Sequence, residues 1–199
     1  MCSPSLAPVL EEYKELLESD IVVNTDSVMI ARNTPSITYG LRGLAFFEWR
    51  VFGPQSDLHS GIFGGVVHNP AQALCELIAG MHDEKGRVTL PGYYDPVIPV
   101  SEKEHKQLAE SPLDEDFYLK QMGVNELWGE EGYIPAERIG ARPTLEINGL
   151  YSGFIGQGSK TVIPSWAMAK ISMRLVPNQD PAEVQQQLVK YLQTHAPNT

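Results

Sequence analysis

The sequence lacks the features that mark several classes of protein. It has only two cysteines in 199 residues, Cys2 and Cys75, and therefore neither a disulfide framework nor a CxxC pair. No run of 18 apolar residues is present, which predicts no membrane span, and the acidic first twenty residues do not match a signal peptide. These absences favour a reducing, cytoplasmic setting. Cys75 is predicted to lie on the apolar face of a helix.

Positive charge is also scarce. The chain has 15 lysines and arginines against 25 aspartates and glutamates, which gives a formal net charge of −10. This balance argues against nucleic acid and anionic membrane surfaces as partners. Apolar residues make up 42% and charged residues 20%, an ordinary globular composition that excludes disorder for most of the chain.

The first forty residues predict a small unit of their own. Apolar residues at helical spacing predict a helix over about residues 5–18, and the β-branched run at residues 21–23 predicts a short buried strand. Asp26 follows that strand, at the kind of position where ligands gather in open α/β sheets, although a strand-end turn or cap explains it equally well. Residues 31–40 form a connecting segment that could separate two domains.

The rest of the chain alternates between strand and helix patterns. After a strand and a polar loop at 53–65, we expect a helix with Asn69 as its N-cap, an insertion over about 93–142, and a last helix that begins at Asp180. The expected strands are 41–52, 86–90, 143–151 and 167–176; the expected helices are 69–83, 101–110, 114–122 and one from 180 onward. This order predicts an α+β fold, a ferredoxin-like split βαβ sandwich in which an antiparallel sheet carries helices on one face.

Three sites stand out for their chemistry. His59, in a glycine-rich loop, could donate to an oxyanion, accept a proton or bind a metal, or could simply be an exposed or capping residue that Asp57 orients. Arg174, in an alternating strand, could grip a carboxylate bidentately or face solvent. Residues 153–161 resemble a phosphate-binding loop, but Ser159 separates the last glycine from the lysine, which disfavours nucleotide binding. Metal binding by this chain alone is weakly supported, because HExxH is absent.

Four motifs in order resemble the carnosinase-type branch of the dinuclear zinc peptidase family, whose members include aminoacylases, acetylornithine deacetylase and succinyl-diaminopimelate desuccinylase. The motifs are Thr-Tyr-Gly-Leu-Arg-Gly at 38–43, Asp-Leu-His-Ser-Gly at 57–61, Gly-Ser-Lys-Thr-Val-Ile-Pro at 158–164 and Arg-Leu-Val-Pro at 174–177. In that family a smaller lid domain, which also forms the dimer, interrupts a zinc-binding catalytic domain. The resemblance implies that residues 41–199 are the lid and that residues 1–40 are a remnant of the catalytic domain.

The resemblance also implies roles for individual residues. Asp26 matches the family's late metal-binding aspartate, and His59 matches the lid histidine that polarises the scissile carbonyl in the neighbouring subunit. Thr161 matches the threonine that also approaches the partner's substrate, and Arg174 matches the arginine that holds the substrate's carboxylate. The implied whole enzyme is a homodimer with two Zn²⁺, Mn²⁺ or Co²⁺ ions that hydrolyses dipeptides or N-acyl amino acids.

Other family residues are missing from this sequence. They are the early His-x-Asp, the bridging aspartate, the Glu-Glu pair and the late histidine, so we expect a fragment that binds no metal tightly and hydrolyses no dipeptide alone. The alternative hypothesis is a free-standing ferredoxin-like regulatory module that binds a small molecule.

Overall fold

The computed structural model describes residues 4–23, 29, 33–36, 38 and 40–197. Contacts divide the chain into two units, Met1–Thr38 and Tyr39–Thr199. In the first unit, helices α1 (Leu6–Glu12) and α2 (Lys14–Leu17) occupy the segment predicted to be helical, and neither contains a buried residue.

The prediction of a buried strand at residues 21–23 is wrong. These three residues have no strand structure, and their exposed fractions are 79%, 83% and 79%. A β-branched run becomes a stable strand only when a neighbouring strand pairs with it, and no such pairing involves these residues in the described part of the chain.

The second unit is built on an antiparallel three-stranded sheet in the order β1-β5-β3. Its strands are β1 (Gly43–Phe52), β3 (Thr144–Ser152) and β5 (Trp166–Leu175). The central strand alternates buried and outward-facing residues along its whole length, as the pattern predicted, because successive side chains of a strand point to opposite faces. Leu44 and Thr144 both lie opposite Arg174, which sets the register at one end of the sheet.

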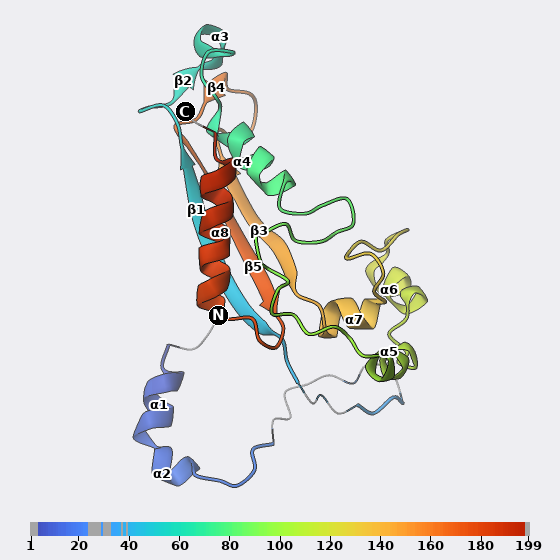
Figure 1. The fold of residues 1–199 in the computed structure, drawn as a ribbon. Helices are drawn as coiled ribbons and strands as arrows, with labels where there is room; N and C mark the ends of the chain where they lie inside the picture. The colour runs from blue at the N-terminus through green and yellow to red at the C-terminus, as the bar shows by residue number, and fades with distance from the viewer. Residues whose placement is uncertain (1–3, 24–28, 30–32, 37, 39, 198–199) are drawn as a thin grey trace. The chain divides into compact units, whose positions relative to one another are not determined.

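Two helices, α4 (Pro70–Ala79) and α8 (Pro181–His195), cover one face of this sheet (Figure 1). Each begins at a predicted cap. Oδ1 of Asn69 and Oδ1 of Asp180 accept the backbone N–H two residues further on, at 2.9 and 2.7 Å, and a proline follows in the first turn of each helix. The predicted α+β sandwich, with an antiparallel sheet and helices on one face, is confirmed.

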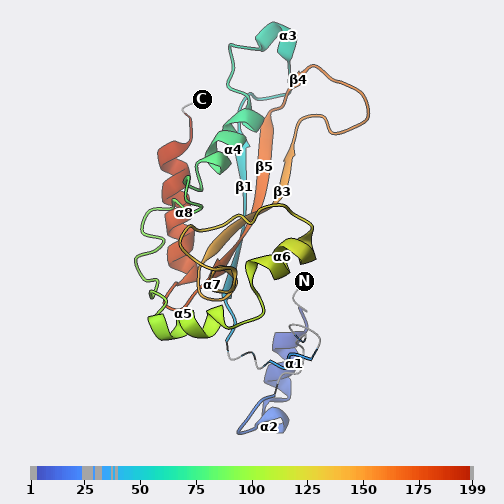
Figure 2. The ribbon, with the colours of Figure 1, turned by 90° about the vertical axis from the view of Figure 1, so that its right-hand side faces the viewer.

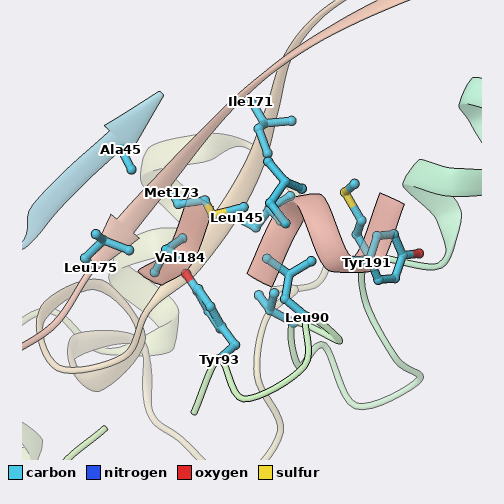
Figure 3. Close-up of a cluster of buried hydrophobic side chains, with 12 residues drawn as sticks. Ala45, Leu90, Tyr93, Leu145, Ile171, Met173, Leu175, Val184 and Tyr191 are labelled. Carbon is cyan, nitrogen blue, oxygen red and sulfur yellow. The ribbon is translucent and has the colours of Figure 1, made fainter. Parts of the chain in front are cut away.

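The core lies between α8 and the inward face of the sheet (Figure 3). Val184, Leu188 and Tyr191 project from the helix, and the Tyr191 hydroxyl donates to the carbonyl of Leu77 in α4 at 2.9 Å. The other buried members of this cluster are Ala45, Met81, Val88, Leu90, Tyr93, Leu145, Ile171, Met173 and Leu175.

The predicted insertion contains the two expected helices, α5 (Glu102–Ala109) and α6 (Glu115–Met122), and a third that the sequence analysis missed, α7 (Pro135–Gly140) (Figure 2). The carboxylate of Glu137, which is 2% exposed, links α5 to the start of α7. It accepts the backbone N–H of Ile134 at 2.9 Å and contacts the Nδ1 atom of His105 in α5 at 2.7 Å.

Three further expectations were wrong. Residues 86–90 form no strand beyond a single bridge to His82, because the Asp83 carboxylate accepts two backbone N–H groups and bends the chain into a turn that Gly86 completes at a φ of 70°. Helix α4 stops at Ala79, before Gly80, instead of near Asp83. Cys75 is exposed, since α4 turns other residues toward the core.

Candidate functional site

The loop predicted at residues 53–65 contains a short ordered tip. Strand β2 (Leu58–His59) pairs with β4 (Val162–Ile163), and the four-residue helix α3 (Ser60–Phe63) follows directly. The backbone N–H of Ser60 donates to the carbonyl of Thr161 at 3.1 Å and extends the pairing by one step. These elements lie together at the end of the sheet where β1 ends and β5 begins (Figures 1 and 2).

This pairing brings His59 and Thr161 together. The Nε2 atom of His59 lies 3.1 Å from Oγ1 of Thr161, and its Nδ1 atom accepts the backbone N–H of Gly61 at 3.0 Å. An imidazole nitrogen that accepts an N–H carries no proton itself, so the neutral ring has its proton on Nε2 and donates it to the threonine. The site therefore presents an exposed N–H donor, the group that oxyanion stabilisation requires.

Asp57 does not orient the His59 ring directly, contrary to the interpretation from the sequence. Its Oδ1 atom accepts two hydrogen bonds from Ser165, one from the backbone N–H at 2.9 Å and one from the hydroxyl at 3.0 Å. These bonds stabilise the charged form and lower the pKa of the Asp57 carboxyl below its usual value. Asp57 thus connects the segment before His59 to Ser165, the residue that directly precedes β5.

The glycine-rich segment at 153–161 connects β3 to β4 and precedes no helix. Gly153 and Gly158 have φ values of 63° and 92°, which side chains other than glycine rarely adopt. The segment therefore lacks the helix N-terminus that a phosphate-binding loop needs.

Arg174 lies at the other end of the sheet, where β5 ends and β1 begins. Its side chain lines a groove of about 350 Å³, a volume sufficient for a small ligand. The other charged and polar residues that line this groove include Arg42, His82, Glu130, Arg138, Arg142, Thr144, Glu146, Asn148 and Ser172. Among the described residues, the Arg174 guanidinium has no ion pair or hydrogen bond within the chain, which leaves it available to a ligand.

The predicted site residues therefore occupy two places. His59 and Thr161 share the tip, whereas Arg174 is separated from it by most of β5. From Trp166 to Arg174 the strand advances eight residues, about 26 Å at the usual rise. One chain cannot place His59 and Arg174 on the same small ligand.

The described residues do not form a metal site. No group of three or more histidine, cysteine, aspartate or glutamate side chains among them could hold an ion. Asp26, the predicted metal ligand, lies outside the described residues. In the same part of the chain, no helix combines the length and apolar character needed to cross a membrane.

Comparison with known proteins decides the family. The family model described as the peptidase dimerisation domain matches residues 39–199, which include the whole sheet, both covering helices and the insertion. The chain belongs to the peptidase dimerisation domain family. The resemblance inferred from the four motifs is confirmed.

Relatives of this dimerisation domain are dipeptidases by name. The chain is 33% identical to human Beta-Ala-His dipeptidase over 193 residues, which are 96% of this chain and 38% of the relative. It is 34% identical to the Cys-Gly metallodipeptidase dug1 of Schizosaccharomyces pombe, covering 90% of this chain and 38% of that protein. The chain thus spans well under half of the length of these curated relatives.

Solved structures agree with the fold of the dimerisation domain. An M20 family metallo-carboxypeptidase, Sso-CP2 from Sulfolobus solfataricus, matches with a TM-score of 0.81 at 33% identity, over 97% of this chain and 50% of that one. Human carnosine dipeptidase 1 matches with a TM-score of 0.82 at 32% identity, over 96% of this chain and 41% of that one.

The sequence analysis named no role for two residues that line the Arg174 groove, Arg42 and Glu146. Arg42 stands inside one of the four motifs, and that position was the available signal. Glu146 lies opposite Ser172 in the β3–β5 register, so only the strand pairing identifies it as a neighbour of the groove.

Proposed function

We propose that residues 41–199 are the lid and dimerisation region of a metal-dependent dipeptidase or related amide-bond hydrolase, and that residues 1–40 belong to its catalytic domain. The family match and the named activities of the relatives support this assignment. The chain alone is inactive, because it contains no described metal site and no general base beside one.

His59 is the electrophilic catalyst in this proposal. Its Nε2–H, held toward Thr161, is reoriented by a small side-chain movement to donate to the carbonyl oxygen of the scissile bond. That oxygen gains negative charge as the amide is attacked, and a preorganised donor stabilises the charge more than water does. Thr161 keeps the donor nitrogen in place before substrate arrives and then contacts the substrate itself.

Arg174 binds the substrate's carboxylate. The guanidinium lines a groove large enough for an amino acid residue and has no described partner in the chain. Its planar pair of N–H donors matches a carboxylate in two parallel hydrogen bonds. This preference accounts for hydrolysis of the amide bond next to a free carboxylate, as in a dipeptide or an N-acyl amino acid.

The single observation that carries the proposal is the separation of His59 from Arg174 along β5. His59 lies beyond the start of β5 and Arg174 near its end, and the strand advances about 26 Å between Trp166 and Arg174, so the two residues serve one small substrate only if they come from different chains. A homodimer with twofold symmetry provides that arrangement: each active site receives Arg174 from its own chain, and His59 and Thr161 from the partner.

Metal ions would supply an activated water at the catalytic domain, with Asp26 as one ligand. The described residues contribute none of the other ligands, so no step of the reaction is assigned to metal through this chain. We propose zinc, manganese or cobalt as the metal and the cytoplasm as the location, on the strength of the metallopeptidase relatives and the scarcity of cysteine.

A mixing experiment with the whole enzyme tests the proposal. His59→Ala and Arg174→Ala variants are each expected to lose about 100-fold or more in hydrolysis of β-alanyl-histidine or cysteinyl-glycine. When the two variants are unfolded together and reassembled, about half of the dimers are mixed, and one of the two sites in each mixed dimer is intact. The mixture should therefore recover about one quarter of the wild-type activity.

A reassembled mixture of dimers as inactive as its components would show that both residues of a site come from the same chain, and would overturn the proposed division between subunits. Sedimentation provides an independent check, because the 199-residue chain at high micromolar concentration should have twice the 22.0 kDa mass of one chain. If the whole enzyme, as distinct from the 199-residue chain, hydrolyses neither dipeptides nor N-acyl amino acids with any of the three metals, the regulatory-module hypothesis is favoured instead.

A further inference from the structure

Arg42 is fastened to helix α7 at the edge of the Arg174 groove. Its Nη1 atom donates to the carbonyls of Arg138 and Arg142, at 3.2 and 3.1 Å. The Arg138 carbonyl belongs to the last turn of α7, where the carbonyl groups of a helix have no partner within the helix and carry partial negative charge, and Arg142 follows the C-cap residue Ala141. A cation at this position satisfies these acceptors, and its own side chain is thereby held in one place.

The segment that follows α7 is held in place by the contacts of Arg142. The Arg142 side chain is buried, and its guanidinium makes two hydrogen bonds to the Glu130 carboxylate, at 2.8 and 2.7 Å. The same guanidinium lies over the rings of Tyr133 and Tyr94, at 4.2 and 5.2 Å from their centroids. The carbonyls that hold Arg42 therefore belong to one of the best-supported segments of the insertion.

Arg42 lies close to Arg174. It directly precedes β1, whose second residue, Leu44, is the register partner of Arg174, and both arginines line the same groove. Burial and the nearby positive charge of Arg174 lower the pKa of the Arg42 guanidinium below its usual value, whereas Glu146 acts in the opposite direction. The charged residues that line the groove are four arginines and two glutamates: Arg42, Arg138, Arg142, Arg174, Glu130 and Glu146. Arg142 forms an ion pair with Glu130, so three arginines remain beside the carboxylate of Glu146, and a bound anion would relieve the repulsion between them.

We propose that Arg42 is a positioning residue for Arg174. Held by hydrogen bonds to the carbonyls of Arg138 and Arg142, it places a second positive charge beside the Arg174 guanidinium. It thereby keeps that guanidinium directed into the groove, where it can bind a ligand carboxylate. The inference rests on the proposed role of Arg174 as the carboxylate-binding residue. It adds a specificity element, because two cations discriminate against a neutral C-terminal amide more strongly than Arg174 alone.

The test uses NMR on the 199-residue chain, with N-acetylglycine as the carboxylate probe and N-acetylglycinamide as its neutral counterpart. Arg42→Gln removes the positive charge and the guanidinium that bonds two carbonyls, whereas Arg42→Lys keeps the charge. Arg50→Gln is the control, because it removes an equal charge at the far end of β1. Two quantities are measured: the dissociation constant of each probe, and the side-chain Nε–H signal of Arg174 without any probe.

We expect Arg42→Gln to raise the dissociation constant of N-acetylglycine about fivefold and to move or broaden the ligand-free Arg174 signal. Arg42→Lys should restore more than half of the lost affinity, and Arg50→Gln should match wild type in both measurements. Should Arg42→Gln fail to fold, Arg42→Lys still tests the inference through the Arg174 signal, since a single ammonium cannot reproduce the two-carbonyl anchor geometry.

The inference is overturned if both Arg42 variants leave the Arg174 signal unchanged, or if Arg42→Gln binds N-acetylglycine within about twofold of Arg50→Gln. Failure of the proposed function looks different. In that case wild type binds the carboxylate and the amide equally, and Arg174→Gln changes neither affinity, whatever Arg42 does to the ligand-free signal.

Discussion

The His59 ring has both of its nitrogen atoms occupied, and this determines its chemistry. Because Gly61 donates to Nδ1, the proton of the neutral ring belongs on Nε2. We predict that ¹⁵N NMR above pH 8 finds an unprotonated Nδ1 and a protonated Nε2. Thr161→Val should leave this tautomer unchanged, since the Gly61 contact remains; a ring protonated on Nδ1 would contradict the assignment of Nε2 as the donor.

Asp57 gives a second test on the scale of one residue. Hydrogen bonds from Ser165 lower its folded-state pKa, so the interaction is fully present above the unfolded value of about 3.9 and is lost as the pH falls through the lower folded value. We predict that the backbone amide signal of Ser165 titrates with a midpoint below 3.9.

Asp57→Asn serves as the control for this titration, because an amide side chain does not ionise. The Ser165 signal of this variant should show no acid transition of its own. A midpoint at or above the ordinary aspartate value in the wild-type chain would mean that the two hydrogen bonds do not form in solution.

At the scale of the element, helix α8 offers a matched pair of neighbouring positions. Leu188 is 3% exposed and packs in the core, whereas Val189 is 43% exposed on the same helix. We predict that Leu188→Ala lowers the free energy of unfolding by about 2–5 kcal/mol, through lost burial and the cavity left behind. Val189→Ala should change it by less than about 0.5 kcal/mol.

Denaturant unfolding followed by circular dichroism measures both effects. Similar values for the two variants would indicate that α8 does not pack on the sheet through Val184, Leu188 and Tyr191.

Long elements could be predicted from the sequence, and short ones could not. The strands β1, β3 and β5 have nine or ten residues, enough for alternation to distinguish them from helices, and α4 and α8 have clear caps. The strands β2 and β4 have two residues each, so no periodicity exists to detect. Residues 21–23 show the opposite failure, since an apolar run indicates a strand without identifying its partner.

The candidate site could be predicted by residue but not by arrangement. His59 and Thr161 are 102 residues apart in sequence, and only the pairing of two very short strands joins them. The distance between His59 and Arg174 follows from the sheet register, which no local pattern specifies. The four motifs identified His59, Thr161 and Arg174 as candidates, but only the structure shows that they lie at two ends of the sheet.

On the scale of the molecule, the two units differ in burial. Helices α1 and α2 and residues 21–23 contain no buried residue, whereas β5 is the central strand of the sheet. We predict that amides of residues 6–23 exchange with solvent within minutes, and that those of β5 are protected up to global unfolding. Hydrogen exchange detected by mass spectrometry measures this contrast, and strong protection of α1 would contradict it.

The placement of His59 and Arg174 at opposite ends of β5 has a kinetic consequence for an enzyme assembled as proposed. A lone subunit then has only half of each active site, so turnover per chain is no longer constant on dilution. Below the dissociation constant of the dimer, the rate would rise with the square of the enzyme concentration. The rate of hydrolysis in the cell would then rise steeply above a threshold concentration of subunit, instead of in proportion to that concentration.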